Sequence, residues 1–372
     1  MIGEFEGCTI ALAHDWLVGM RGGEQVLDRL ARLFGPTELY TLVRDHSPMS
    51  EAISACRVVT SPLQRFPGAP GVLRRHYLPL FPWAINRLTV ANCDLLISTS
   101  SAVIKSIRAP AGTPHLCYCH SPARYIWGQA AAYGSRRGAP GSRLRSIGLR
   151  AVRDPFRRWD RRTARRVTRF LANSRHTADQ IQRCWGRDAE VVHPPARTGW
   201  FTVDPAIQRE PWLLIASALE PYKRVELAIE AANRRSWPLK VAGKGSQHAA
   251  LKAMAGPTVT FEGWVGDAAL RDLYRRARAL LYPQVEDFGI TAVEAQACGC
   301  PVVAFEGGGA LDSVTTKTGV LFKEQTADAL CEAVDTLDDR SIDPIACRRN
   351  AERFSEKVFD EAIIAQVRDL VG

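Results

Sequence analysis

The chain has 372 residues, of which 46% are hydrophobic and 24% charged, and its formal net charge is +10. This length exceeds the roughly 200 residues of an ordinary compact domain, so we expect two domains, each with its own core. No apolar run approaches the roughly 18 residues of a membrane-spanning helix, and the start of the chain, with Glu4 and Glu6, lacks the pattern of a secretory signal, so we expect a cytoplasmic protein.

In the first half, short apolar runs alternate with helical patterns, as is typical of a doubly wound parallel sheet. The expected strands are residues 9–13, 39–42, 95–98, 115–119 and 170–172. Gly22 and Gly23 stand where the helix after the first strand should begin. Glycines there let the backbone approach a ligand and point its amides at phosphate, although many strand–helix turns use glycine for geometry alone.

His120 directly follows the expected strand at 115–119, within Tyr-Cys-His-Ser-Pro-Ala-Arg-Tyr-Ile-Trp. It should therefore lie on a turn at the carboxyl end of that strand. A single histidine in such a place is usually structural, so the residues around it have to decide its role.

Residues 136–169 contain thirteen arginines and only two acids, with leucine, isoleucine, valine, phenylalanine and tryptophan between them. The first 200 residues hold 29 Lys+Arg against 14 Asp+Glu, whereas the rest hold 20 against 25. A basic segment with apolar insertions indicates either a contact with an anionic membrane surface or a solvated helix face. Binding of nucleic acid is a weaker alternative, because no recognised motif or array of stacking aromatics accompanies the arginines.

Two prolines at 194–195 are typical of a linker, so we place the first domain at residues 1–195 and the second at 196–353. The strands expected in the second domain are 212–217, 239–242, 258–261, 279–282, 301–305 and 319–321. Each of these α/β domains would contain a doubly wound, Rossmann-like sheet, and the two domains would face a cleft.

Glu286 and Glu294 bracket a turn that opens a helix between two of these strands. The amides of Phe288, Gly289 and Ile290 at the helix start would point out of the carboxyl end of the sheet, where a diphosphate would fit. Glu294, one turn into the helix, could accept hydrogen bonds from a ribose diol, and Glu286 would be free to face a sugar. The alternative is a solvated acidic turn.

This segment resembles the Glu-x7-Glu motif of glycosyltransferase family 4, the retaining GT-B enzymes that use nucleotide sugars, and the resemblance extends over almost the whole chain. It implies that Gly22 and Gly23 lie beside the donor diphosphate. The segment around His120 is similar to one in mannosyltransferases that make bacterial surface polysaccharides, which implies a place for His120 near the donor sugar. The resemblance also implies that the last helix, 354–372, packs back on the first domain.

Residues 216–230 resemble the family segment that supplies cations to the diphosphate, with Lys223 as the cation. Ala218 stands where many members have arginine, so either Arg224 or an arginine of the first domain replaces it, or phosphate is bound more weakly. The turn that contains Val265 is similar to the family's turn near the nucleobase.

The resemblance implies a retaining hexosyltransferase, in which Glu286 orients the donor sugar and stabilises the cationic transition state. We expect α-mannosyl transfer from GDP-mannose to a polyprenyl-diphosphate-linked oligosaccharide, in exopolysaccharide or O-antigen synthesis, by a protein peripheral on the inner face of the cell membrane. No Asp-x-Asp pair follows a strand and the ten cysteines include no Cys-x-x-Cys pair, so we expect neither a metal nor another cofactor. Alternatives are a UDP-hexose-dependent transferase or a sugar-nucleotide epimerase of the same fold.

Overall fold

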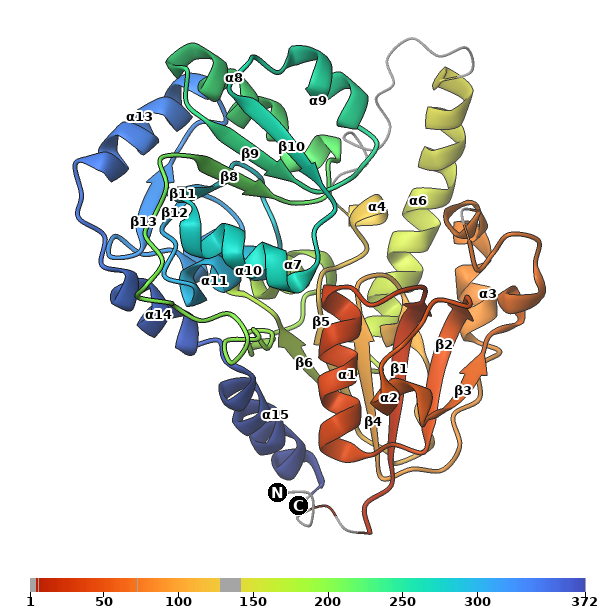
Figure 1. Cartoon of the computed structure of the whole chain (residues 1–372). Coiled ribbons are helices and arrows are strands. Elements are labelled where there is room, and N and C mark those ends of the chain that lie inside the picture. The colour runs from red at the N-terminus through yellow and green to blue at the C-terminus, as the bar shows by residue number, and fades with distance from the viewer. Residues whose placement is uncertain (1–4, 6, 72, 128–141, 372) are drawn as a thin grey trace. The chain divides into compact units, whose positions relative to one another are not determined.

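The computed structural model in Figure 1 describes residue 5 and residues 7–71, 73–127 and 142–371. The chain forms two compact units. The first consists of Met1–His193 together with Asp360–Gly372, and the second is Pro194–Phe359.

The first unit is built on a seven-stranded parallel sheet with the order β3-β2-β1-β4-β5-β6-β7. Its strands are β1 (Ile10–Leu17), β2 (Glu38–Arg44), β3 (Arg57–Thr60), β4 (Leu95–Ser100), β5 (His115–Cys119), β6 (Arg169–Ala172) and β7 (Glu190–Val191). The five strands expected from apolar runs are present. The two that were missed, β3 and β7, are short edge strands, which bury too little side chain to need an apolar run.

Helices lie between these strands and cover the sheet (Figure 1). They are α1 (Gly22–Phe34), α2 (Glu51–Ser54), α3 (Phe81–Ile85), α4 (Arg124–Trp127), α6 (Ser142–Ala164) and α7 (Arg175–Trp185), with 3₁₀ turns η2 (Pro62–Arg65), η3 (Arg74–Leu80) and η4 (Ile104–Ser106). In α1 the apolar residues Val26, Leu27 and Leu30 share one face, which is fully buried. Gly35 ends α1 in the left-handed conformation that glycine adopts at little cost.

A buried ion pair holds α6 in the core of the first unit. Lys105 Nζ lies 2.9 Å from Asp160 Oδ1, and both side chains are fully buried. The other carboxylate oxygen of Asp160 accepts hydrogen bonds from the indoles of Trp127 and Trp185, each at 2.7 Å. One carboxylate thus joins four elements, which are η4, α4, α6 and the end of α7.

The apolar residues of α6 correct one sequence-based expectation. Phe156 and Trp159 are only 3% and 9% exposed and pack in the core, so they cannot insert into a membrane as the pattern suggested. Exposed arginines remain on this helix, at 158, 161 and 162, and the exposed Arg165 directly follows it. The side chains of residues 142–152, which include Ile147 and Val152, lie outside the description.

The second unit has a six-stranded parallel sheet with the order β10-β9-β8-β11-β12-β13. The strands, all of which the sequence predicted, are β8 (Leu213–Ala216), β9 (Leu239–Ala242), β10 (Val259–Gly263), β11 (Ala279–Tyr282), β12 (Val302–Phe305) and β13 (Gly319–Phe322). Its helices are η5 (Pro221–Lys223), α8 (Val225–Arg235), α9 (His248–Met254), α10 (Asp267–Arg276), α11 (Ile290–Ala297), α12 (Ala310–Ser313), α13 (Ala327–Asp338) and α14 (Pro344–Glu352). The prediction of two doubly wound α/β domains is confirmed.

The last helix, α15 (Glu356–Val371), begins in the second unit and ends in the first. Arg29 of α1 donates to Asp360 with Nε at 2.7 Å. Gln366 accepts a hydrogen bond from Arg169 at 2.8 Å and donates one to Glu190 at 2.6 Å. These contacts attach the end of the chain to α1 and to the β6–β7 edge of the first sheet.

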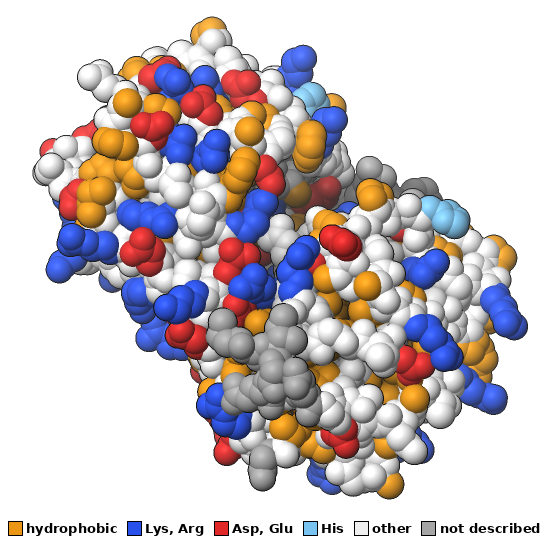
Figure 2. All heavy atoms as spheres, turned by 60° about the horizontal axis from the view of Figure 1, so that its bottom comes forward, with side chains coloured by type: hydrophobic (Ala, Val, Ile, Leu, Met, Phe, Trp, Pro, Cys, Tyr) orange, Lys and Arg blue, Asp and Glu red, His pale blue; other side chains and the backbone are white. Residues whose placement is uncertain are grey.

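None of the described helices is both long and apolar enough to cross a bilayer. On the face of the molecule shown in Figure 2, basic and acidic side chains are interspersed. The excess of positive charge is therefore not gathered on that face.

We predict that Lys105→Met destabilises the first unit by about 3–5 kcal/mol, because it leaves the carboxylate of Asp160 buried without its counter-charge. Urea denaturation followed by tryptophan fluorescence measures the change. Glu352→Gln, which removes an exposed ion pair with Arg348, is the matched control and should change stability little. Equal midpoints for both variants would contradict the assignment of Asp160 as an anchor.

Candidate active site

Each sheet has one point at which the direction of its strand order reverses. In the first unit this point lies between β1 and β4, and in the second it lies between β8 and β11. In doubly wound sheets, ligands bind outside the carboxyl ends of the strands at this switch point. The predicted site residues fall into two groups near these ends, one in each unit.

Gly22 and Gly23 are the first two residues of α1, after the loop that follows β1. A Cβ on Gly22 would meet no atom of the described chain within 4 Å. One on Gly23 would lie 3.5 Å from the His14 ring and 3.6 Å from His120 Nε2, which are ordinary contacts. Packing within the unit therefore does not require glycine at either position. Close approach of a ligand to the α1 amides, as the sequence predicts, would require it.

The backbone of His120 is fixed at the end of β5. Its N–H donates to the carbonyl of Ser100 at 2.7 Å, and its carbonyl accepts from the side chain of Asn173 at 3.0 Å. The residue is partly exposed, but its Nε2 atom is buried and has no hydrogen-bond partner among the described residues. Burial and, second, the nearby His14 lower the pKa of His120 to about 3. The imidazole is thus neutral near pH 7 and can hydrogen-bond through Nε2 beside Gly23.

His14 in β1 and Glu24 in α1 form a buried polar pair beside these residues. His14 Nδ1 lies 2.6 Å from Thr99 Oγ1, and its Nε2 lies 3.7 Å from a carboxylate oxygen of Glu24. Glu24 also accepts from the N–H of Arg21 at the start of α1. Burial opposes ionisation of Glu24, but the hydrogen bond and charge of His14 together with the amides hold its pKa below the ordinary value. A carboxylate therefore lies next to the predicted phosphate loop, with His14 as its partner.

In the second unit, Lys223 and Glu286 form an ion pair across the switch point. Lys223 ends η5, in the loop after β8, and Glu286 lies in the loop after β11. Their side chains bond through Nζ and Oε1 and are 15% and 14% exposed. An ammonium has three N–H donors, so Lys223 can hold Glu286 and an anionic ligand together. The two residues that the sequence assigns to charge stabilisation are thus in contact.

The glycine turn after β12 fixes the backbone around Glu286. The N–H of Gly309 donates to the carbonyl of Glu286 at 2.8 Å. A Cβ on Gly308 would lie 2.2 Å from that carbonyl oxygen, and one on Gly309 would lie 2.3 Å from Phe288 Cα. Glycine alone permits this approach, so the turn positions the loop that carries the predicted catalytic carboxylate.

Helix α11 begins at Ile290, after Gly289, whose φ of +87° suits glycine. The Phe288 side chain is 3% exposed and packs against Phe354, with ring centroids 5.4 Å apart. Phe288 can therefore serve a ligand only through its backbone, as predicted. The amides of Phe288, Gly289 and Ile290 follow β11 at the switch point.

Glu294 is more deeply buried than the sequence suggested, with 6% of the residue exposed. Its carboxylate lies 3.7 Å from Arg197, which in turn pairs with Asp267 at 2.5 Å. Burial raises the pKa of Glu294 to about 7, against the opposing effect of Arg197. The Tyr274 hydroxyl, whose pKa burial and the charge of Glu294 raise, is buried without a hydrogen-bond partner among the described residues. A ribose diol would have to reach Glu294 past Arg197.

Arg224 and Val265, the other two predicted donor contacts, lie after β8 and β10. The guanidinium of Arg224 donates to Glu226 at 2.6 Å and to Gln325 at 3.4 Å, so it would have to leave these partners to bind phosphate. Val265 packs against the core of the unit.

Sequence reasoning missed Arg197, His14 and Glu24. His14 gave a weak signal, because it is the first polar residue after the apolar run Ile-Ala-Leu-Ala that begins β1. Glu24 stands three residues after Arg21, at the third position of a helix, where acids often cap the amides. Arg197 gave none, since its contact with Glu294 joins residues far apart in the chain.

Two family models match consecutive parts of the chain. The model described as Glycosyltransferase Family 4 covers residues 20–199, and that described as Glycosyl transferases group 1 covers 200–354. The chain belongs to glycosyltransferase family 4. The expected family and the expected activity class, a glycosyltransferase, are confirmed.

Curated relatives share parts of this sequence. A D-inositol 3-phosphate glycosyltransferase of Gordonia bronchialis is 32% identical over an alignment of 186 residues, and the match covers 41% of this chain and 41% of the relative. A GDP-mannose-dependent alpha-mannosyltransferase of Mycolicibacterium smegmatis is 28% identical over 228 residues, 58% of this chain and 60% of the relative. The matches thus span about two fifths and three fifths of these relatives.

Solved structures confirm the GT-B fold. The sucrose-phosphate synthase of Thermosynechococcus elongatus matches with a TM-score of 0.72 at 18% identity, covering 97% of this chain and 99% of that one. Anabaena HepE in complex with UDP matches with a TM-score of 0.69 at 17% identity, covering 97% and 100%.

The raised pKa of Glu294 predicts how the stability of the protein depends on pH. The folded-state pKa of about 7 lies above the ordinary 4.5, so the stability that the proton contributes is complete below pH 4.5 and is lost as the pH rises through about 7. Glu294→Gln should remove this decline and raise the free energy of unfolding near pH 8 by up to roughly 3 kcal/mol relative to wild type. Denaturation at a series of pH values measures it, with Glu352→Gln as the control. Superimposable pH profiles for wild type and Glu294→Gln would refute the burial argument.

Proposed function

We propose that this glycosyltransferase transfers mannose, with retention of configuration, from GDP-mannose to a lipid-linked oligosaccharide. The observation that carries the proposal is the Lys223–Glu286 ion pair at the switch point of the second unit, beside the amides that open α11. A cation, a carboxylate and the amides at the start of a helix together suit a donor that is anionic at its diphosphate and becomes cationic at its sugar.

The charges of the proposed reaction match this arrangement. As the bond from the sugar to the diphosphate breaks, negative charge grows on the diphosphate and positive charge on the sugar ring. Lys223 and the amides of residues 288–290 would stabilise the first, and Glu286 the second, more strongly in the transition state than in the ground state. We propose that Lys223 and these amides do this without a metal ion.

In the first unit, His120 would serve the sugar of the donor, and the start of α1 would serve its diphosphate. Neutral His120 offers Nε2 to a hydroxyl group, and Gly22 and Gly23 leave room at the start of α1. A cationic histidine would repel positive charge on the sugar, so its low pKa suits a hydrogen-bonding role.

The choice of GDP-mannose rests on sequence. It is supported by the segment around His120 and by the likeness to the Mycolicibacterium smegmatis enzyme, whose name states that donor. HepE, which shares the fold, was solved with UDP, so a UDP-hexose is the second candidate.

The proposed acceptor is a polyprenyl-diphosphate oligosaccharide presented at the inner face of the membrane. Exposed Arg158 and Arg162 on α6, with Arg165 directly after it, would attract such an anionic surface, each by about 1 kcal/mol at best. The buried Phe156 and Trp159 do not take part.

Removing either charge of the central pair should abolish transfer. We expect Glu286→Gln and Lys223→Met each to lower kcat at least about a hundredfold, the scale for a preorganised electrostatic group. Because the two side chains act on one bond, the double variant should lose far less than the product of the single losses. Circular dichroism and the thermal transition verify folding, and near-normal turnover of Glu286→Gln would falsify its catalytic role.

A donor panel tests the substrate. We expect GDP-mannose to raise the thermal midpoint of the protein more than UDP-glucose, UDP-galactose or UDP-N-acetylglucosamine does, since a ligand at 100 times its dissociation constant adds about 2.7 kcal/mol of stability. Transfer from GDP-mannose should survive EDTA. Binding of a UDP-sugar alone would favour the second candidate, and release of an epimerised nucleotide sugar would identify an epimerase. Loss of transfer on EDTA treatment that Mg²⁺ restores would contradict metal-independent chemistry.

A further inference from the structure

The segment from Pro62 to Arg87, between β3 and β4, keeps large apolar side chains in solvent. Leu73, Leu80 and Trp83 are 41%, 37% and 40% exposed. Among the described residues of the first unit, Met20 is the one other large apolar side chain with this much exposure. Three such residues within eleven positions form a local apolar surface, whereas exposed apolar residues elsewhere in a protein are usually scattered.

This surface has a rigid base. Phe66 lies against both Tyr77 and Trp83, with ring centroids 5.5 and 6.1 Å apart. Leu80 and Trp83 are three residues apart on a continuous helical stretch, which places them on the same side. Exposure of Trp83 and Leu80 therefore does not come from a loose loop.

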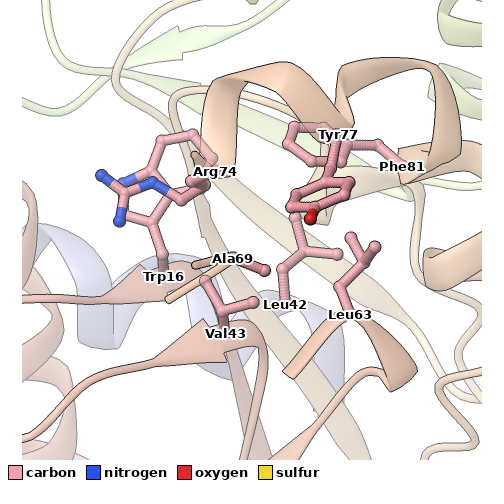
Figure 3. Close-up of a pocket in the computed structure, with 8 residues that line it drawn as sticks. All are labelled: Trp16, Leu42, Val43, Leu63, Ala69, Arg74, Tyr77 and Phe81. Carbon is pink, nitrogen blue, oxygen red and sulfur yellow. The ribbon is translucent and has the colours of Figure 1, made fainter. Parts of the chain in front are cut away.

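The segment lies at the carboxyl end of the first sheet. Trp16 at the end of β1, together with Leu42 and Val43 of β2, lines a narrow pocket with residues of the segment (Figure 3). Arg74 crosses the Trp16 ring at 4.8 Å and donates to the carbonyl of Pro70. The apolar surface is thus attached to the end of the sheet at which Gly22, Gly23 and His120 also lie.

The charged residues within this stretch of the sequence have one sign. Residues 52–93 contain five arginines, at 57, 65, 74, 75 and 87, and no aspartate or glutamate. Arg65 and Arg87 are exposed at either end of the segment. An apolar patch with tryptophan and leucine, flanked by arginine and free of acids, is complementary to the anionic headgroups and upper acyl chains of a bilayer.

We infer that residues 62–87 dock the first unit on an anionic lipid bilayer, with Leu73, Leu80 and Trp83 inserted at the level of the headgroups and Arg65 and Arg87 among the phosphates. The inference rests on the proposed function for its purpose, because an acceptor whose lipid stays in the membrane must be met at the carboxyl end of the sheet. The apolar part of the membrane contact is therefore placed in residues 62–87 and not in α6, where Phe156 and Trp159 are buried.

Flotation with vesicles tests the inference. Wild-type protein should bind vesicles of equal parts phosphatidylglycerol and phosphatidylcholine, and part of the binding should persist in 1 M salt, where the screening length is about 3 Å. The variant Leu73→Ser/Leu80→Ser/Trp83→Ser should bind at least roughly tenfold more weakly and lose the salt-resistant part. The matched variant Met254→Ser/Leu311→Ser/Ile345→Ser, changed at exposed apolar residues of the second unit, should bind like wild type.

Two further measurements support the flotation test, a double variant and the quenching of tryptophan fluorescence. Leu73→Ser/Leu80→Ser keeps the Phe66–Trp83 contact, and it should show an intermediate loss if the triple variant folds poorly. Brominated lipids should quench part of the wild-type tryptophan fluorescence, and Trp83→Phe should remove most of that quenching. Undiminished vesicle binding by both serine variants would overturn the inference, as would binding only to vesicles that contain a lipid-linked sugar acceptor.

A different result would refute the proposed function. Transfer from a nucleotide sugar to a short, soluble acceptor analogue does not need the bilayer. Absence of that transfer with every donor would refute the proposed function whatever the vesicles show. Normal transfer by a protein that ignores anionic vesicles would refute the docking surface alone.

Discussion

The candidate site depends on a property of doubly wound parallel sheets. All the strands have their carboxyl ends at one edge, and at one switch point the strand order changes direction, so the loops on either side lead away from each other. In the second unit that point lies between β8 and β11, and the loops leaving these strands bring Lys223 to Glu286 although 63 positions separate them. Glycines at 308 and 309 then fix the Glu286 backbone from the next loop. Chemistry is thus assembled from short segments on a rigid frame.

The ionisable side chains near the carboxyl ends of the strands are arranged differently in the two units. In the second, Lys223 and Glu286 are in contact, so the carboxylate already holds the cation in the position where the proposed diphosphate would meet it. In the first, burial keeps His120 neutral while Glu24 and His14 balance each other. The carboxyl ends of the two sheets thus offer different electrostatic environments, an ion pair in the second unit and a neutral imidazole in the first.

The strands and helices were well predicted from the sequence, because apolar runs bounded by glycine and proline indicate buried segments. All strands of the second unit and the helix between Glu286 and Glu294 were predictable on that basis. Short edge strands such as β3 were not, since they bury little. For Phe156 and Trp159 neither of the two alternatives, a membrane contact or a solvated face, was right, because composition cannot reveal which face of α6 meets Lys105 and the core. The contact of Arg197 with Glu294 joins distant segments, and local patterns carry no information about it.

The final helix has a consequence for how the protein is made. Helix α15 contributes Asp360 and Gln366 to the first unit, where they bond Arg29, Arg169 and Glu190. The ribosome therefore completes the amino-terminal unit only when it has synthesised the last turns of the chain. Until then, the faces of α1 and of the β6–β7 edge that α15 covers stay exposed, and the nascent protein must be kept from aggregating through them.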